Sequence, residues 1–151
     1  MITHVWTVVC TRSIQDAESK NVSLIDVIEQ INVGDPRPSK GEVRLAPISV
    51  DVVTLWAREP STAPDPARAR VAMVSPEGKT MGEATYNVDL SANVRLRSVT
   101  RIAGIPISEE GVMRFQVDLE VPGKGWDRRA DVPVQIVALG AMVEGGPPAD
   151  R

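Results

Sequence analysis

Three arginines at alternating positions are the side chains of this chain best suited to bind a ligand. In the segment VRLRSVTR, a strand would point Arg95, Arg97 and Arg101 to one side and its apolar residues to the other. Guanidinium groups form paired hydrogen bonds with phosphate and carboxylate groups, and they also contact the phosphates of nucleic acids. The stripe therefore predicts a site for a phosphate, a carboxylate or a nucleic-acid backbone.

The same arginines also have a purely structural explanation. The next predicted strand carries Asp118 and Glu120 on its polar face, and the last predicted strand carries Asp131. Opposite charges on neighbouring strands pair across a sheet, and exposed pairs contribute only about 0.2–1 kcal/mol each. Such pairs keep a sheet soluble and in register. We take this pairing as the leading expectation for the stripe.

Trp126 is the fourth candidate ligand-binding residue. It follows PGKG in a predicted hairpin turn, where an exposed aromatic ring is able to stack on a ligand or to anchor an interface. Trp56 ends the run ISVDVVTLW, which is apolar on both faces, so we expect this second tryptophan to pack inside.

The sequence nominates no catalytic residue, no metal site and no cofactor. His4, the only histidine, and Cys10 lie on one predicted strand about 20 Å apart, which excludes a catalytic dyad. The motifs G-x-x-x-x-G-K, C-x-x-C and G-x-S-x-G are absent, so we predict that the protein is not an enzyme. Four loop carboxylates lack the ordered spacing of a calcium site and are expected to be solvated: Asp16, Glu18, Asp35 and Asp65.

The elements that position these residues are predicted to be strands. The chain holds 22 Val, 10 Ile and 8 Thr against 7 Leu, and β-branched side chains suit a pleated surface. Segments such as EATYNVDL and GVMRFQVDLEV alternate strictly between apolar and polar residues, as half-buried strands do. We therefore predict an all-β, antiparallel two-sheet β-sandwich of about eight strands, with a small β-barrel as the alternative. The strands are expected near residues 3–12, 22–33, 46–58, 68–75, 80–90, 93–103, 112–121 and 127–138.

Two of these strands carry specific expectations. The segment DAESKNVSLIDVIEQINV has a weak helical stripe, but its many β-branched residues favour a strand over residues 22–33 that forms a hairpin with the first strand. Because both its faces are partly apolar, we expect a central strand. Pro133 lacks a backbone donor, so the final strand is expected at an edge or at a bulge.

Length and charge limit the classes of function. A chain of 151 residues suits one domain, which we place at residues 1–139, with a flexible tail over residues 140–151. The net charge of -3 makes nucleic acid and anionic membranes improbable partners. The single cysteine and the lack of a signal peptide or membrane span predict a cytoplasmic protein.

Several segments resemble a family of small bacterial proteins that carry a domain of unknown function. They are HVWTVVCTRSIQDAESKNVSLIDVIEQI, VSPEGKTMGEATYNVDL and GIPISEEGVMRFQVDL, so the resemblance covers roughly residues 3–137. It implies a β-sandwich fold and offers no catalytic site to transfer.

Together these features predict a non-enzymatic β-sandwich that works by binding. The leading hypothesis is an accessory or assembly module that binds a partner protein or a second copy of itself, through exposed sheet edges and end loops. The alternative is a module for a small ligand, namely a carbohydrate, an anion or calcium, bound at the end loops or at the arginine stripe.

Overall fold

The computed structural model describes residues 1–34, 43–63 and 66–139, and in these residues it contains strands and no helix. The predicted all-β class is therefore confirmed. The nine strands are β1 (Ile2–Gln15), β2 (Val22–Val27), β3 (Gln30–Val33), β4 (Arg44–Arg58), β5 (Ala67–Val74), β6 (Thr80–Val88), β7 (Arg95–Ile107), β8 (Gly111–Val121) and β9 (Gly125–Ala138). No helix long and apolar enough to cross a membrane occurs in the described residues. The predicted tail at residues 140–151 and the loop residues Asp35 and Asp65 lie outside the described part of the chain.

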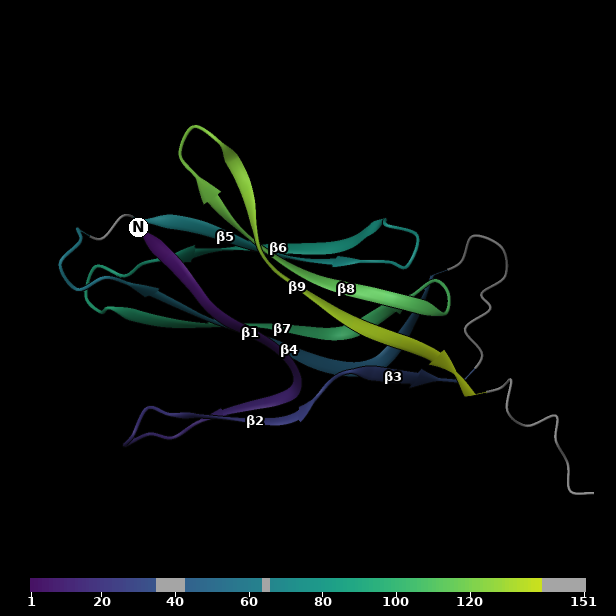
Figure 1. The fold of residues 1–151 in the computed structure, drawn as a ribbon. Helices are drawn as coiled ribbons and strands as arrows, with labels where there is room; N and C mark the ends of the chain where they lie inside the picture. Colours follow the sequence, from purple (N-terminus) through teal and green to yellow (C-terminus); the bar gives the residue numbers. More distant parts are fainter. Residues whose placement is uncertain (35–42, 64–65, 140–151) are drawn as a thin grey trace, which may run out of the picture.

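The strands form two curled sheets that pack face to face (Figure 1). One sheet has four strands in the order β2-β1-β4-β7, and the other has five in the order β3-β9-β8-β5-β6. Alternation along each strand sends one set of side chains between the sheets, where each large apolar side chain stabilises the fold by about 1.5–3 kcal/mol. The largest fully buried side chains include Trp56, Phe115, Leu90, Ile105 and Met113. The prediction that Trp56 packs inside is confirmed.

The predicted strand over residues 22–33 is wrong in one respect, because the structure divides it between the two sheets. β2 is an edge strand of the four-stranded sheet, and β3 is an edge strand of the five-stranded sheet. The chain crosses over at Ile28 and Glu29, where the Ile28 amide donates to the Val9 carbonyl and the Gln135 amide donates to the Glu29 carbonyl. Asp26 precedes this crossing with a positive φ of 51°. Both faces are apolar because the two halves belong to different sheets, and neither half is central.

The pairing around Pro133 also differs in detail from the prediction. β3 runs parallel to β9, so the fold is not entirely antiparallel. β9 lies between β3 and β8, but β3 pairs only with the last four residues of β9. The Gln135 amide points toward β3, so the nitrogen of Pro133, two residues earlier, points to the same side. There β9 has no ladder partner, so Pro133 does occupy a local edge.

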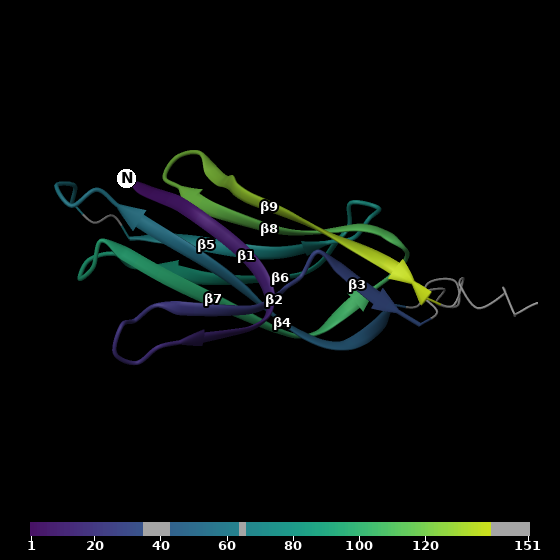
Figure 2. The same cartoon turned by 60° about the horizontal axis from the view of Figure 1, so that its bottom comes forward.

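The strand β1 bends sharply at its middle and shapes the outer face of the four-stranded sheet. Residues 2–10 pair with β4, whereas residues 10–15 leave β4 and pair with β2. Cys10 belongs to both pairings and marks the bend. Figures 1 and 2 show the hairpin of β1 and β2 standing off from β4 and β7 on the side away from the second sheet. We call residues 11–27 the β1–β2 hairpin.

Candidate functional site

A groove of about 930 Å³ lies between the β1–β2 hairpin and the outer face of β4 and β7. It collects all three arginines of the predicted stripe, together with Lys20 from the hairpin. None of its lining residues is an aspartate or a glutamate. The lining consists of Trp6, Ser13, Gln15, Ser19, Lys20, Asn21, Val22, Leu55, Asn93, Arg95, Leu96, Arg97, Val99 and Arg101. We refer to this site as the basic groove.

Asp51 holds the hairpin in position over the sheet. Its side chain points to the outer face, yet the residue is only 1% exposed because the bend of β1 covers it. Where β1 leaves β4, the Ser13 backbone amide loses its ladder partner, and it donates instead to Asp51 Oδ2 at 3.0 Å. The Ser13 hydroxyl donates to the same oxygen at 2.8 Å. At the far end of the hairpin, Arg97 Nη2 donates to the Lys20 carbonyl at 3.1 Å.

Arg101 is paired with the same carboxylate. Its Nε donates to Asp51 Oδ1 at 2.9 Å, and its Nη2 donates to Asp51 Oδ2 at 3.2 Å. The hydrogen bond from Arg101 is the main cause that lowers the pKa of Asp51 below that of an ordinary aspartate. Burial acts in the opposite direction, and the two bonds from Ser13 add to the lowering. Arg101 is therefore fixed at one end of the groove with its charge balanced.

Arg95 and Arg97 have no carboxylate partner in the described residues. Arg95 is exposed and makes no hydrogen bond or ion pair within the described part of the chain. Arg97 is half-buried, and its buried Nε has no hydrogen-bond partner there. Across β4, Arg97 stands opposite Leu55 and Arg95 stands opposite Ala57. Two positive charges of the groove are thus left uncompensated.

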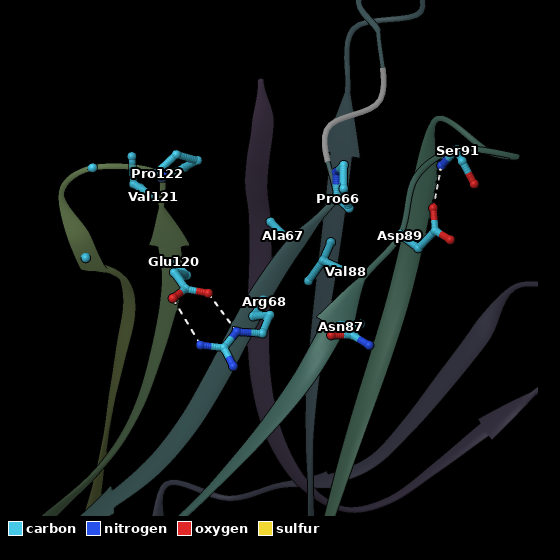
Figure 3. Close-up of a pocket in the computed structure, with 12 residues that line it drawn as sticks. Pro66, Ala67, Arg68, Asn87, Val88, Asp89, Ser91, Glu120, Val121 and Pro122 are labelled. Carbon is cyan, nitrogen blue, oxygen red and sulfur yellow. Dashed lines mark hydrogen bonds and ion pairs between the residues drawn. The ribbon is translucent and has the colours of Figure 1, made fainter.

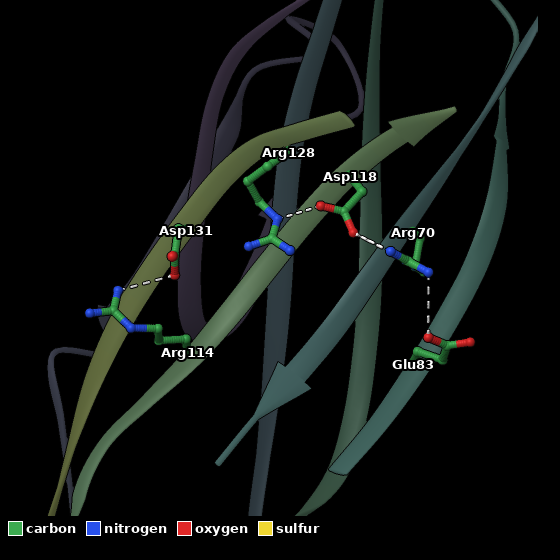
Figure 4. A network of polar contacts seen from close by, with 6 residues as sticks. All are labelled: Arg70, Glu83, Arg114, Asp118, Arg128 and Asp131. Atoms are coloured by element: carbon green, nitrogen blue, oxygen red, sulfur yellow. Dashed lines mark hydrogen bonds and ion pairs between the residues drawn. The ribbon is translucent and has the colours of Figure 1, made fainter. Parts of the chain in front are cut away.

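Three carboxylates were expected to neutralise the arginine stripe, but they form ion pairs with other arginines instead. That expectation is therefore wrong. β7 and β8 belong to different sheets, which places Asp118, Glu120 and Asp131 on the far side of the molecule. There Asp118 lies between Arg70 and Arg128, as Figure 4 shows. The other pairs of that face are Arg70 with Glu83, Arg114 with Asp131 and Arg68 with Glu120.

The network around Asp118 neutralises the outer face of the five-stranded sheet. Asp118 is 2% exposed, and its Oδ2 accepts a hydrogen bond from Arg70 Nη2 at 2.6 Å while Oδ1 accepts one from Arg128. Burial alone would raise the pKa of Asp118, but the hydrogen bonds and charges of Arg128 and Arg70 outweigh burial and lower it. The arginines of this face are held by structural pairs.

Trp126 belongs to this second face and is not brought together with the arginine stripe. The guanidinium carbons of Arg68 and Arg70 lie 5.7 and 4.6 Å from the centre of its ring. Stacking of arginine on tryptophan is favourable in itself, so Trp126 already has a structural partner. The aromatic side chain of the basic groove is Trp6, which sequence reasoning did not single out. A bulge between His4 and Trp6 shifts the alternation of β1 and turns Trp6 outward.

A second hollow, of about 700 Å³, lies at one end of the sandwich beside the β8–β9 turn (Figure 3). Its one arginine, Arg68, is bound by Glu120 through two hydrogen bonds of 2.7 and 3.0 Å. Asp89 accepts a hydrogen bond from the Ser91 amide at 2.9 Å. The charged groups at this end are occupied with one another or with the backbone, which distinguishes it from the basic groove.

His4 and Cys10 have structural surroundings. His4 packs edge-on against Trp56, with ring centres 5.7 Å apart, and its Nε2 lies 2.8 Å from the Thr7 hydroxyl. Cys10 is fully buried at the bend of β1, and burial raises the pKa of its thiol, with the charge of Asp51 adding to the effect. Within the described residues, no three His, Cys, Asp or Glu side chains gather in a way that would hold a metal ion.

The chain matches no known protein-family profile, and no curated protein aligns with it significantly. The resemblance to a family of bacterial proteins therefore stays a prediction.

Proposed function

We propose that the protein is a non-enzymatic binding module that holds an anionic ligand in the basic groove. The observation that supports this most strongly is the contrast between the two outer faces. The arginines of the five-stranded sheet are paired with carboxylates, whereas Arg95 and Arg97 face a groove without a carboxylate in its lining. This proposal takes up the small-ligand alternative, at the arginine stripe and for an anion.

The groove offers the chemistry that an anion requires. Arginine and lysine donate charge-assisted hydrogen bonds, which are about twice as strong as neutral ones, and arginine does so in pairs to phosphate, sulfate or carboxylate. Asn21 and Asn93 add neutral donors, and Trp6 and Leu55 provide apolar surface beside the charges. The protein as a whole has a net charge of -3, so the basic groove is a local concentration of positive charge on an acidic chain.

The lining residues are suited to binding charge rather than to transferring protons. His4 and Cys10, the residue types whose ordinary pKa lies nearest to neutral pH, are not among them. Asp51 is engaged by Ser13 and Arg101. These arrangements support the proposal of a protein without enzymatic activity.

A cytoplasmic location belongs to the same proposal. Its support is the sole cysteine of the chain, Cys10, which is a buried free thiol, as is usual in a reducing compartment.

The direct test is calorimetric titration with sulfate, inorganic phosphate, citrate and tripolyphosphate. The wild type should bind at least one of them, and the double variant Arg95→Gln/Arg97→Gln should bind it at least about 10-fold more weakly, since a lost charge-assisted hydrogen bond costs about 1.5–3 kcal/mol. The matched control is Lys79→Gln/Lys124→Gln, which removes two positive charges from exposed turns of the other sheet. If no anion binds, or if both double variants lose affinity equally, the proposal is wrong.

A further inference from the structure

We infer that the anionic ligand is an acidic, extended segment of a partner protein, which binds as an added strand along β7. This inference rests on the proposed function and names the partner of the same groove. It returns to the hypothesis of a protein-binding module and gives that hypothesis a place in the fold.

The first observation is the position of β7 in its sheet. β7 is the last strand of the order β2-β1-β4-β7, and among the residues that the structure describes it pairs with β4 alone. Half of its backbone N–H and C=O groups therefore point away from β4. Such an edge is a template for another strand, and the hydrogen bonds of the added strand provide affinity that does not depend on its sequence.

The second observation is the spacing of the outward side chains. Arg95, Arg97, Val99 and Arg101 follow one another at every second position of β7 on the outer face. An added strand has the same repeat of about 6.6–7 Å for every two residues, so its own alternate side chains stand beside these four. The partners that fit are carboxylates beside Arg95 and Arg97 and an apolar or small residue beside Val99.

Charge complementarity selects the sequence of the added strand. Within the described residues Arg95 and Arg97 have no carboxylate partner, whereas Arg101 is already paired with Asp51. Val99 is 45% exposed, although it lies on the same outer face as its buried neighbour Val53. A strand with Asp or Glu at two successive outward positions covers both free guanidinium groups. A strand with Lys or Arg there is repelled, so the charges also protect the edge from unsuitable partners.

The third observation is an opening beside β7. β6 faces β7 across the side of the sandwich, but no ladder joins them. A cavity of about 310 Å³ separates the two strands, lined by Gly82, Glu83 and Ala84 on one side and by residues 100–103 on the other. The edge of β7 is thus not closed by the second sheet at residues 100–103, whereas closer to Arg97 the Ser98 hydroxyl lies 3.1 Å from the Tyr86 hydroxyl of β6.

A nucleic acid fits the same surface less well. Proteins that bind nucleic acid through its backbone commonly neutralise about 6–10 phosphates. The basic groove offers three cations without a carboxylate partner in the described residues, namely Arg95, Arg97 and Lys20. The net charge of -3 opposes a long polyanion further.

The test uses the full chain and peptides of matched composition. The probe is the acetylated and amidated octapeptide (Glu-Thr)4, and its control is Thr-Thr-Glu-Glu-Glu-Glu-Thr-Thr, which has the same charge without the alternation. A third peptide carries N-methyl groups on the four central residues of the probe, which keeps the charge and removes the backbone donors toward β7 whichever way the added strand runs. Titration calorimetry measures affinity, and amide chemical shifts locate the site.

The expected result is that the alternating peptide binds at least about 10-fold more tightly than the rearranged and the N-methylated peptides. Its amide shifts should centre on β7, and the binding should be lost in Arg95→Gln/Arg97→Gln but kept in Lys79→Gln/Lys124→Gln. If all three peptides bind equally and the binding depends on Arg95 and Arg97, strand addition is refuted while anion binding stands. If an oligothymidylate of eight nucleotides binds more tightly than every peptide at the same arginines, the partner is a nucleic acid and the inference is wrong. If no peptide, oligonucleotide or small anion binds, the proposed function itself fails.

Discussion

Replacing Asp51 by Asn tests whether this carboxylate holds the β1–β2 hairpin over the sheet. Asn has nearly the same shape and keeps one oxygen for the two donors of Ser13, while it removes the charge and replaces Oδ1, the acceptor of Arg101 Nε, by an NH2 group. The substitution therefore separates the charge of Asp51 from its packing at the bend of β1.

The expected magnitude follows from the two bonds that Ser13 donates to Asp51 Oδ2, at 3.0 and 2.8 Å. A hydrogen bond to a charged group contributes about 1.5–3 kcal/mol and a neutral one about 0.5–1.5, so each bond weakens by about 1 kcal/mol. The free energy of unfolding should fall by about 2 kcal/mol. For a chain of this size that is a decrease in Tm of about 4–8 °C. We assign no energy to the pair with Arg101, which is 68% exposed and screened by solvent.

The effect should depend on pH in a defined direction. Because folding lowers the pKa of Asp51, its contribution is fully present above the pKa of an unfolded aspartate, about 3.9, and is lost as the pH falls through the folded value. The difference in stability between the wild type and Asp51→Asn should therefore be constant between pH 5 and 7, as about 2 kcal/mol, and should shrink in acid.

Urea unfolding at several pH values measures this difference, and native-state hydrogen exchange of the Ser13 amide reports the hairpin locally. The matched control is Glu18→Gln, which removes one negative charge from an exposed turn of the same hairpin and should change stability by less than about 0.5 kcal/mol. Equal stability of Asp51→Asn and Glu18→Gln, with unchanged protection of the Ser13 amide, would refute the role of Asp51.

Three further predictions concern the core, the hairpin turn and the cysteine. Phe115→Ala, at a fully buried position between the sheets, should lower the free energy of unfolding by about 3–5 kcal/mol in urea titrations, and a loss below 1 kcal/mol would contradict the assigned core. Lys20 has a positive φ of 61°, so Lys20→Gly should keep the free energy of unfolding or raise it by up to about 1 kcal/mol. The same variant should bind an anion more weakly in calorimetry. A clear loss of stability would be the opposite of what the strained backbone predicts. Cys10 is fully buried with a raised pKa, so iodoacetamide should label it only after unfolding, and rapid labelling of the native protein, followed by mass spectrometry, would show that the bend of β1 opens.

The strands were predictable where one face of a segment is buried and the other is solvated. The segments around Phe115 and Tyr86 alternate in this way, and both form strands, β8 and β6. The turn in SPEGK was also predictable from the sequence, because Gly78 takes the left-handed φ of 86° that only glycine adopts without strain.

The division of residues 22–33 between two sheets was not predictable, because it depends on what packs around the segment. Local patterns record which residues are apolar, but not which sheet buries them. Ile28 and Ile31 face the core, whereas Val27, which also reads as a core residue, is 59% exposed. Tertiary pairing with β9, more than 100 residues away along the chain, decides the outcome.

The arginines of the candidate site were predictable from the sequence, but the shape of the groove was not. Side chains alternate between the two faces of a strand, and this alternation along β7 was enough to place Arg95, Arg97 and Arg101 on one face. The hairpin that turns this face into a groove left a weaker signal, in the run ISVDVVTLW, whose outward face also carries the apolar residues Val53 and Leu55. Val53 and Asp51 are buried on the outer side of β4 because the bend of β1 covers them. Apolar residues on both faces of a strand in a two-sheet fold therefore indicate a third layer over part of the sheet.

The contrast between the two outer faces is the main argument for the proposed anion site. On the five-stranded sheet, Asp118 stands in register between Arg70 on β5 and Arg128 on β9, so each cation has a cross-strand carboxylate. On the four-stranded sheet, the position opposite Arg97 is Leu55. A carboxylate at that position would neutralise the arginine and keep the surface equally soluble. An arginine without a carboxylate in the described residues instead concentrates positive potential beside the apolar floor of the groove. The proposed binding of an anion from outside the chain would supply the missing partner of these arginines.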